Sequence, residues 1–200
     1  MNDTFGDVRD PYFWSGSEVF RNRLNIREAA RLQEAEIAFT SLRAATLELG
    51  PPRPGLPHLC HIHRQLFQDI YEWAGKIRQV DIYRGDTRFC HFDYLEKEGN
   101  AVMRALEDEN YLLGLPLEVF TQRLAHFYCE VNVLHPFRTG NGRAQRIFFE
   151  QLAIHAGYSL DWRGLAVVPW RQANQQGAMG DLQPLEAIFS KVVSEAAETE

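Results

Sequence analysis

An apolar stripe that leads into a glycine-containing turn constrains the fold of this chain more than any other feature. After Pro116, large apolar side chains recur every three or four residues, as on one face of an α-helix: Phe120, Leu124, Phe127, Val131 and Leu134. The next stretch, residues 135–146, reads HPFRTGNGRAQR, and a second helix is expected from about Asn141 to about Gly157. The sequence therefore predicts a central helix, a tight turn and another helix.

Weaker patterns flank this unit. Helices are expected at about 25–49, 58–73, 93–113 and 182–196. Asp93 followed by Glu96 is typical of a helix N-cap and its capping partner. The segment KIRQVDIYRGDTRFCHF has β-branched and aromatic residues on both sides of RGDT, which predicts a hairpin and is the only clear strand signal. The expected class is mostly α with one short β-hairpin, and Trp162 and Trp170 are expected to pack in the core.

The turn itself has the composition of an anion site. Gly140 and Gly142 lack a Cβ, so the backbone around Asn141 can direct its N–H groups toward one point without a steric penalty. A helix that begins there adds the unpaired amides of its first turn and its dipole, both of which favour a phosphate. Arg143 and Arg146 are three residues apart, so they share a face and can bind further phosphate oxygens.

His135 ends the preceding helix directly before the turn, where its imidazole can face a bound phosphate chain. A histidine in that place can deprotonate a hydroxyl that attacks phosphorus, which contributes about 10²–10⁴ in rate. Phe137 is expected to point the other way and to anchor the loop in the core. A lone histidine at a helix end, or a lone Gly-Asn-Gly turn, is more often structural. Both together, with two arginines at helical spacing, favour a catalytic site.

Composition narrows the classes of function. The formal net charge is −6, with 27 acidic and 21 basic residues, which argues against a protein that mainly coats nucleic acid or an anionic membrane. Cys60, Cys90 and Cys129 form no CxxC pair, so neither a disulfide framework nor a zinc knuckle is expected. The N-terminal segment lacks a signal-peptide pattern, and no run approaches the roughly 18 apolar residues of a membrane span. We expect a cytoplasmic protein that contacts neither nucleic acid nor membrane directly.

A histidine-rich segment, HLCHIH, could suggest a metal site. On a helix, however, His58 and His61 share a face, whereas His63 lies well away from His61. We therefore interpret these histidines as structural.

Residues 135–146 resemble the signature of the Fic-domain family, His-x-Phe-x-Asp/Glu-Gly-Asn-Gly-Arg-x-x-Arg. Seven of its eight specified positions match, and Thr139 departs. HRQLFQDIYEWAGKIR is similar to the family's helix before its flap hairpin, and EVNVLHPFR is similar to its central helix. The resemblance implies a single Fic-type helical domain over residues 1–200. Its core would span about 55–160, with helical extensions at both ends and a short β-hairpin flap beside the active-site loop.

The resemblance also implies a reaction, the transfer of AMP from ATP to a hydroxyl side chain of a target protein. His135 would be the general base, and Gly140, Asn141 and Gly142 would hold the phosphates. Arg143 and Arg146 would bind the β- and γ-phosphates, which exposes the α-phosphorus for in-line attack. The flap would dock an extended target segment by main-chain pairing, through these residues: Ile82, Tyr83, Arg84, Gly85 and Thr87.

Thr139 stands where the family has an acidic residue that binds the cofactor Mg²⁺. A neutral hydroxyl is a poorer Mg²⁺ ligand than a carboxylate, so this degenerate metal position should recruit the ion weakly and reduce transition-state stabilisation. Two hypotheses remain open: an adenylyltransferase of reduced activity, and a catalytically disabled Fic scaffold that binds nucleotide or protein. Replacing Thr139 by Glu distinguishes them, because only the first predicts a large gain in AMP transfer.

Fic proteins are restrained by a Ser/Thr-x-x-x-Glu-Gly/Asn helix whose glutamate pairs with the second arginine of the motif. This chain offers only Ser194 to Glu198, followed by Thr199, which we interpret as a chance match. A Fic domain without its own inhibitory helix resembles the toxin of a bacterial toxin–antitoxin pair. The resemblance therefore implies a small antitoxin that supplies the glutamate, and DNA gyrase or topoisomerase IV as the target.

Overall fold

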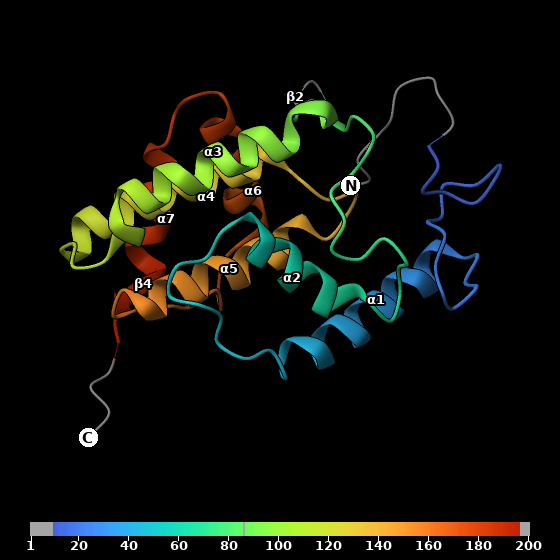
Figure 1. Cartoon of the computed structure of the whole chain (residues 1–200), viewed down its shortest axis with the longest axis horizontal. Helices are drawn as coiled ribbons and strands as arrows, with labels where there is room; N and C mark the ends of the chain where they lie inside the picture. The colour runs from blue at the N-terminus through green and yellow to red at the C-terminus, as the bar shows by residue number, and fades with distance from the viewer. Residues whose placement is uncertain (1–9, 86, 197–200) are drawn as a thin grey trace.

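The computed structural model describes residues 10–85 and 87–196, and helices dominate it (Figure 1). The α-helices are α1 (Ala29–Ala44), α2 (Leu56–Phe67), α3 (Leu95–Asp108), α4 (Leu117–Leu134), α5 (Asn141–His155), α6 (Val167–Ala178) and α7 (Gln183–Val192). Two short 3-10 turns are η1 (Phe92–Tyr94) and η2 (Asn110–Leu112). The strands form two antiparallel pairs, β1 (Tyr83–Arg84) with β2 (Thr87–Arg88), and β3 (Tyr158–Leu160) with β4 (Val193–Glu195). The predicted class, mostly α with a short hairpin, is confirmed.

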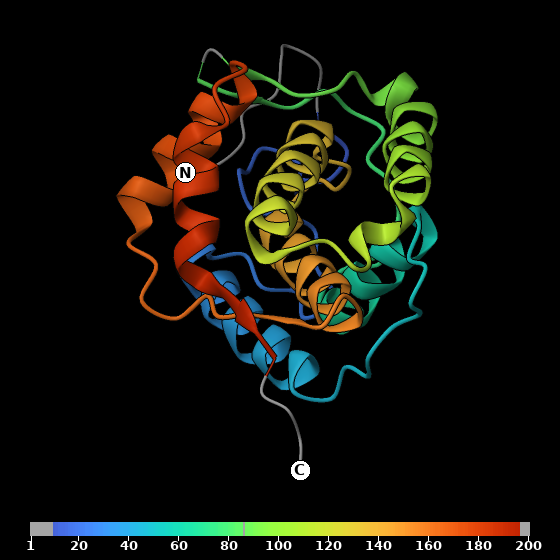
Figure 2. The ribbon, with the colours of Figure 1, turned by 90° about the vertical axis from the view of Figure 1, so that its left-hand side faces the viewer.

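The predicted central helix is also confirmed. Figure 2 shows α4 in yellow and α5 in orange at the middle of the molecule, with α1, α2, α3 and α7 around them. All five stripe residues of α4 are buried, from Phe120 to Leu134. Burying a large apolar side chain contributes about 1.5–3 kcal/mol, so this stripe fixes α4 against α3, α5, α6 and α7. Because α4 is fixed, the turn that follows it has a defined place.

The first helix is shorter at its N-terminal end than the expected range of 25–49. Asn25 has a left-handed backbone with φ of 54°, which an α-helix excludes. The Asn22 side chain accepts from the Ile26 N–H at 2.9 Å and donates to the Ile26 carbonyl at 2.8 Å. An asparagine that bonds the nearby backbone favours a turn over a helix, so α1 begins only at Ala29.

The same helix also ends early, at Ala44. Beyond it, backbone carbonyls are bound by side chains of α5. Gln151 donates to the Glu48 carbonyl at 2.9 Å, and the His155 ring is 2.8 Å from the Gly50 carbonyl. These contacts replace helical hydrogen bonds, so the chain leaves the helix before the glycine and prolines that were expected to stop it.

Two further helix predictions need correction. α2 ends at Phe67 instead of Trp73, because the chain then folds back and the Gly75 N–H donates to the His63 ring at 2.8 Å. The capping box predicted at Asp93 is wrong, since Asp93 lies inside η1 and its own N–H donates to the His91 ring. α3 ends at Asp108 because the backbone of residues 110–112 is left-handed.

The C-terminal part departs most from expectation. α6 and the β3–β4 pair were not predicted, and the last helix ends at Val192 instead of Ala196. Tyr158 pairs with Glu195 across the two strands, a contact between distant segments that no local pattern announces. Trp162 and Trp170 pack against each other and against Phe189, as expected of core residues. Among the described helices, none is long and apolar enough to cross a lipid bilayer.

Candidate active site

The loop between α4 and α5 begins and ends with left-handed backbone. His135 caps α4 with φ of 48°, and Gly140 precedes α5 with φ of 78°. A left-handed conformation costs a residue other than glycine about 1–2 kcal/mol, so the surroundings have to stabilise His135. Its side chain is buried, with 4% of its surface exposed. The predicted position of His135 at the end of the central helix is confirmed.

Arg78 stabilises the C-terminal end of α4 by binding its backbone carbonyls. Its guanidinium donates to the carbonyl oxygens of His135 at 2.7 Å, Val80 at 2.5 Å and Cys90 at 2.6 Å. The backbone N–H of Arg78 donates to the Pro136 carbonyl at 2.9 Å. A positive charge at a helix C-terminus complements the helix dipole. One buried side chain thus joins the backbone of His135 to both arms of the hairpin.

The hairpin covers one face of the His135 ring. The Phe89 ring stacks on the imidazole with centroids 3.9 Å apart and an angle of 18° between the planes. The Cys90 N–H donates to the Val133 carbonyl of α4 at 3.1 Å, which holds the base of the hairpin against the helix. Stacking on this face restricts the orientation of the imidazole.

The expected flap residues occupy different environments. Ile82 is buried, with 1% of its surface exposed, so its side chain supports the hairpin from inside. Tyr83 is half-buried, whereas Arg84 and Gly85 are exposed. Thr87 contributes its backbone to β2, where it pairs with Arg84. The exposed tip is the part of the hairpin that another chain can reach.

The predicted anchoring of the loop by Phe137 is confirmed, and His63 is its partner. The two rings stack with centroids 3.9 Å apart. His63 accepts from the Gly75 N–H through Nδ1, so its Nε2 carries the proton and donates to the Thr139 carbonyl at 3.0 Å. Burial lowers the pKa of His63 to about 4. The neutral ring therefore holds the backbone of Thr139 from the interior.

Asn141 shapes the loop with its side chain. The carboxamide accepts from the Phe137 N–H at 2.8 Å and donates to the Phe137 carbonyl at 2.7 Å. The carboxamide thus ties Asn141 to both polar groups of the Phe137 backbone. Gly140 is required for a second reason, since a Cβ there would lie 2.4 Å from the Phe67 ring.

The N-terminus of α5 is open to an anion. Its N-cap residue, Gly140, makes no side-chain bond to the first amides, and Gly142 has no neighbouring atom within 4 Å of the place where a Cβ would lie. Unpaired amides and the helix dipole favour a phosphate there. Arg143 and Arg146 are both half-buried in the first turns of α5, as their spacing predicts. The arrangement suits a polyphosphate beside a histidine.

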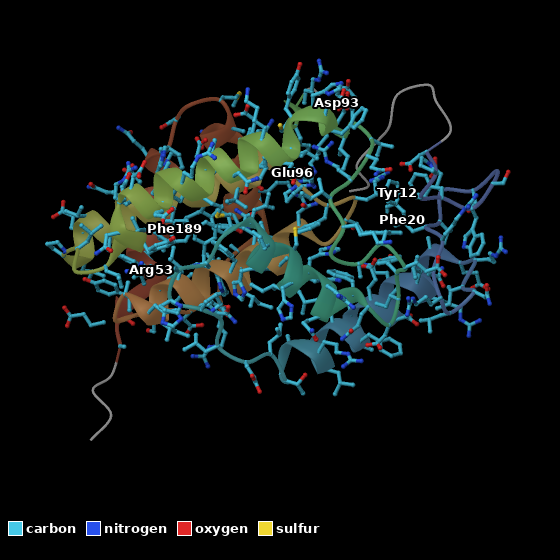
Figure 3. The ribbon with its side chains drawn as sticks, viewed as in Figure 1. Tyr12, Phe20, Arg53, Asp93, Glu96 and Phe189 are labelled. Atoms are coloured by element: carbon cyan, nitrogen blue, oxygen red, sulfur yellow. The ribbon has the colours of Figure 1, made fainter. Side chains whose placement is uncertain are left out.

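The N-terminal segment closes the other side of the loop. Arg138 and Asp10 form a buried ion pair at 2.7 Å, with side-chain exposures of 1% and 3%. The Arg138 guanidinium also lies over the rings of Phe13 and Phe20, 5.0 and 4.9 Å from their centroids. Tyr12 and Phe20 lie on this side of the molecule (Figure 3). The loop is thus held from the N-terminal segment as well as from α2.

The donor set of the loop does not fit a protein-held Mg²⁺. Thr139 offers a hydroxyl and a carbonyl, the latter already bound by His63, whereas Mg²⁺ sites in proteins use one or two carboxylates. No group of three or more His, Cys, Asp or Glu side chains lies close enough to hold a metal within residues 10–85 and 87–196. His58 bonds the Gln151 carboxamide at 2.7 Å, away from His63.

Several residues of the site carried no sequence signal for their role. His63 belonged to a segment considered for metal binding, and the positions of Arg78 and Asp10 relative to the motif depend on contacts across the fold. The match at Ser194 to Glu198 gains no support, because Ser194 lies in β4 and Glu198 lies outside the described residues.

Comparison with known proteins identifies relatives of this arrangement. The sequence model of the Fic/DOC family matches residues 55–153. The chain is 66% identical over 200 residues to a probable protein adenylyltransferase Fic of Salmonella typhimurium. It is 65% identical over 200 residues to a probable protein adenylyltransferase Fic of Escherichia coli K12. Each match covers 100% of this chain and 100% of the relative. The crystal structure of BepC from Bartonella tribocorum with bound AMPPNP is similar with a TM-score of 0.87 and 25% identity, covering 92% of this chain and 97% of that one.

Proposed function

This chain belongs to the Fic/DOC family and is a protein adenylyltransferase, and we propose that His135 and the N-terminus of α5 form its active site. The substrate nucleotide would be ATP, and AMP would pass to a hydroxyl side chain of a target protein. The observation that carries this proposal is the buried, ring-stacked His135 at the loop that leads to the open helix N-terminus.

His135 acts as the general base. Its imidazole takes the proton of the target hydroxyl, and the hydroxyl oxygen forms a bond to the α-phosphorus. The bond from that phosphorus to the bridging oxygen breaks, so pyrophosphate leaves with the electron pair, and the proton passes from the imidazole to solvent. Stacking on Phe89 and the bond from Arg78 to the His135 carbonyl keep the ring in place during this exchange.

The nucleotide phosphates bind the backbone of Gly140, Asn141 and Gly142 at the N-terminus of α5, with Arg143 and Arg146 on the β- and γ-phosphates. A helix N-terminus and two guanidinium groups stabilise the negative charge that builds up on pyrophosphate. The AMPPNP bound in the similar structure of BepC supports a nucleotide as the substrate. Mg²⁺ would reach the site as part of the ATP complex, since Thr139 supplies no carboxylate.

Thr139 lowers the activity. An acidic side chain at this position would add a negative ligand for a nucleotide-bound cation, and a hydroxyl cannot replace it. The enzyme would therefore transfer AMP slowly with Thr139 in place. A catalytically disabled scaffold that only binds nucleotide or protein is the alternative that this substitution raises.

The target docks at the exposed tip of the β1–β2 hairpin. Arg84 and Gly85 are reachable there, and an extended segment can pair with the main chain of a short edge strand. A small antitoxin that supplies an inhibitory glutamate is the partner we propose, because the chain lacks a complete inhibitory motif. DNA gyrase and topoisomerase IV are the candidate targets, on the basis of resemblance to Fic toxins.

We further propose that residues 1–200 act as one domain in the cytoplasm. A single cluster of buried apolar residues reaches from Val19 to Val193. Cys60, Cys90 and Cys129 are free thiols, which a reducing compartment preserves.

The test compares the wild-type chain with Thr139→Glu and Thr139→Gln in an assay of AMP transfer from α-labelled ATP. We expect the glutamate variant to gain at least tenfold and the glutamine variant to gain nothing, since the two side chains differ mainly in charge. Equal, unchanged rates in both variants, with ATP binding intact, would favour the disabled scaffold.

A further inference from the structure

The first arginine of the motif is held by a carboxylate from a helix outside the matched segment. The Oε2 atom of Glu36 lies 3.3 Å from Nη1 of Arg143 and accepts its hydrogen bond. Glu36 is on α1, which precedes the family match at residues 55–153 and runs along α2 (Figure 1). A residue that the motif does not include thus contacts a residue that it does.

Glu36 is itself fixed by a buried tyrosine. The hydroxyl of Tyr71 donates to the other carboxylate oxygen of Glu36. Tyr71 is 1% exposed and stacks on Trp73 with centroids 4.3 Å apart, so its hydroxyl has one position. Burial raises the pKa of Tyr71, and the phenol remains a donor. The carboxylate is therefore a rigid acceptor and does not need to be ordered when Arg143 approaches.

The Arg143 guanidinium lies beside the proposed phosphate site. Its central carbon is 5.7 Å from the centroid of the Phe67 ring, and the same ring lies directly against Gly140. Arg143 is thus held between Glu36 on one side and the ring that supports the loop on the other. The contact to Glu36 uses one of five N–H groups, so the remaining donors stay available to phosphate oxygens.

We propose that Glu36 is a positioning residue for nucleotide binding, which with Tyr71 holds Arg143 beside the N-terminus of α5. The inference rests on the proposed function, in which Arg143 binds a phosphate of ATP. Glu36 touches neither substrate nor reacting atoms, and it acts through Arg143 alone.

Two effects of the carboxylate oppose each other. It repels the phosphates, but the side chains of Arg143 and Glu36 are 32% and 15% exposed, so solvent screens part of that repulsion. It also keeps a long, flexible side chain ordered before ATP arrives. Ordering such a side chain on binding corresponds to about threefold to tenfold in affinity. Glu36 makes only one contact with Arg143, at 3.3 Å, and leaves the other donors to phosphate. We therefore expect the ordering effect to exceed the repulsion.

The experiment measures the affinities of ATP and of adenosine by calorimetry for five proteins: wild type, Glu36→Gln, Glu34→Gln, Arg143→Ala and the double variant of Glu36→Gln with Arg143→Ala. Glu34 is exposed on the same helix, so it controls for a charge change on α1. We expect Glu36→Gln to weaken ATP about threefold to tenfold and to leave adenosine unchanged. Glu34→Gln should change neither, and Glu36→Gln should have no further effect when Arg143 is alanine.

Several results would overturn the inference. Tighter ATP binding by Glu36→Gln would mean that the carboxylate competes with phosphate, and unchanged binding would mean that it does nothing for the site. An equal loss in the Arg143→Ala background would mean that Glu36 acts through the fold. If Arg143→Ala itself leaves ATP binding unchanged, the failure lies instead in the proposed function, so the two failures are distinguishable.

Discussion

The Nε2 atom of His63 donates to the carbonyl oxygen of Thr139 at 3.0 Å, from a position that is completely buried. The bond connects α2 to the one residue at which the motif departs from the family signature. It uses the backbone of Thr139, so a change of side chain at this position leaves it intact. The loop conformation and the chemistry of residue 139 are therefore separable.

The stability of the protein should depend on pH through His63. The folded pKa is about 4, whereas an unfolded histidine titrates near 6.5. Between these values the unfolded chain binds a proton that the folded chain excludes. Stability is fully present above about pH 6.5 and is lost as the pH falls toward 4, by roughly 3 kcal/mol from this group.

Urea unfolding of the wild type and of His63→Gln at pH 7 and pH 4.5 measures this contribution. Glutamine can bond the same two backbone groups and does not titrate. We expect the wild type to lose more stability than the variant between the two pH values. Equal losses would show that His63 does not titrate as its burial requires.

Two glycines of the motif should respond oppositely to alanine. At Gly140 a Cβ would meet the Phe67 ring, and the left-handed backbone adds strain, so Gly140→Ala should cost at least about 1–3 kcal/mol. Gly142 is helical and has open space around it, so Gly142→Ala should be neutral or stabilise by up to about 1 kcal/mol. Thermal unfolding of both variants checks the pair, and similar melting temperatures would contradict the loop geometry.

The Asp10–Arg138 pair should be essential for the fold around the loop. Asp10→Asn removes a buried counter-charge from the guanidinium, which costs about 3–5 kcal/mol. Asp93→Asn is the matched control, because Asp93 is exposed and should change stability by less than about 0.5 kcal/mol. Denaturant unfolding gives both values, and a loss at Asp10 no larger than at Asp93 would show that the N-terminal segment does not hold the loop.

The sequence predicted the parts of the fold that local pattern decides. The stripe of α4 and the turn into α5 follow from helical periodicity and from glycine placement, and the β1–β2 hairpin follows from RGDT between β-forming residues. The limits of α1 and the β3–β4 pair could not be predicted. They depend on contacts such as Gln151 with Glu48 and Tyr158 with Glu195, which only the folded chain brings together.

The candidate site divides in the same way. One stretch of the sequence contains His135, the two glycines and the two arginines, so their candidate roles could be predicted from their spacing. The residues that hold them, His63, Arg78 and Asp10, come from other parts of the chain. Asn141 shows the limit of the motif itself, since the two bonds of its side chain to the Phe137 backbone could not be predicted from spacing.

The most direct measurement incubates the chain with α-labelled ATP, Mg²⁺ and a bacterial lysate, and compares it with His135→Ala. Melting curves and ATP binding of the variant establish first that it is folded and that its nucleotide site is intact. We expect a labelled target protein with the wild type and at least a hundredfold less label with His135→Ala. Equal labelling by both proteins would contradict the assignment of His135 as the base.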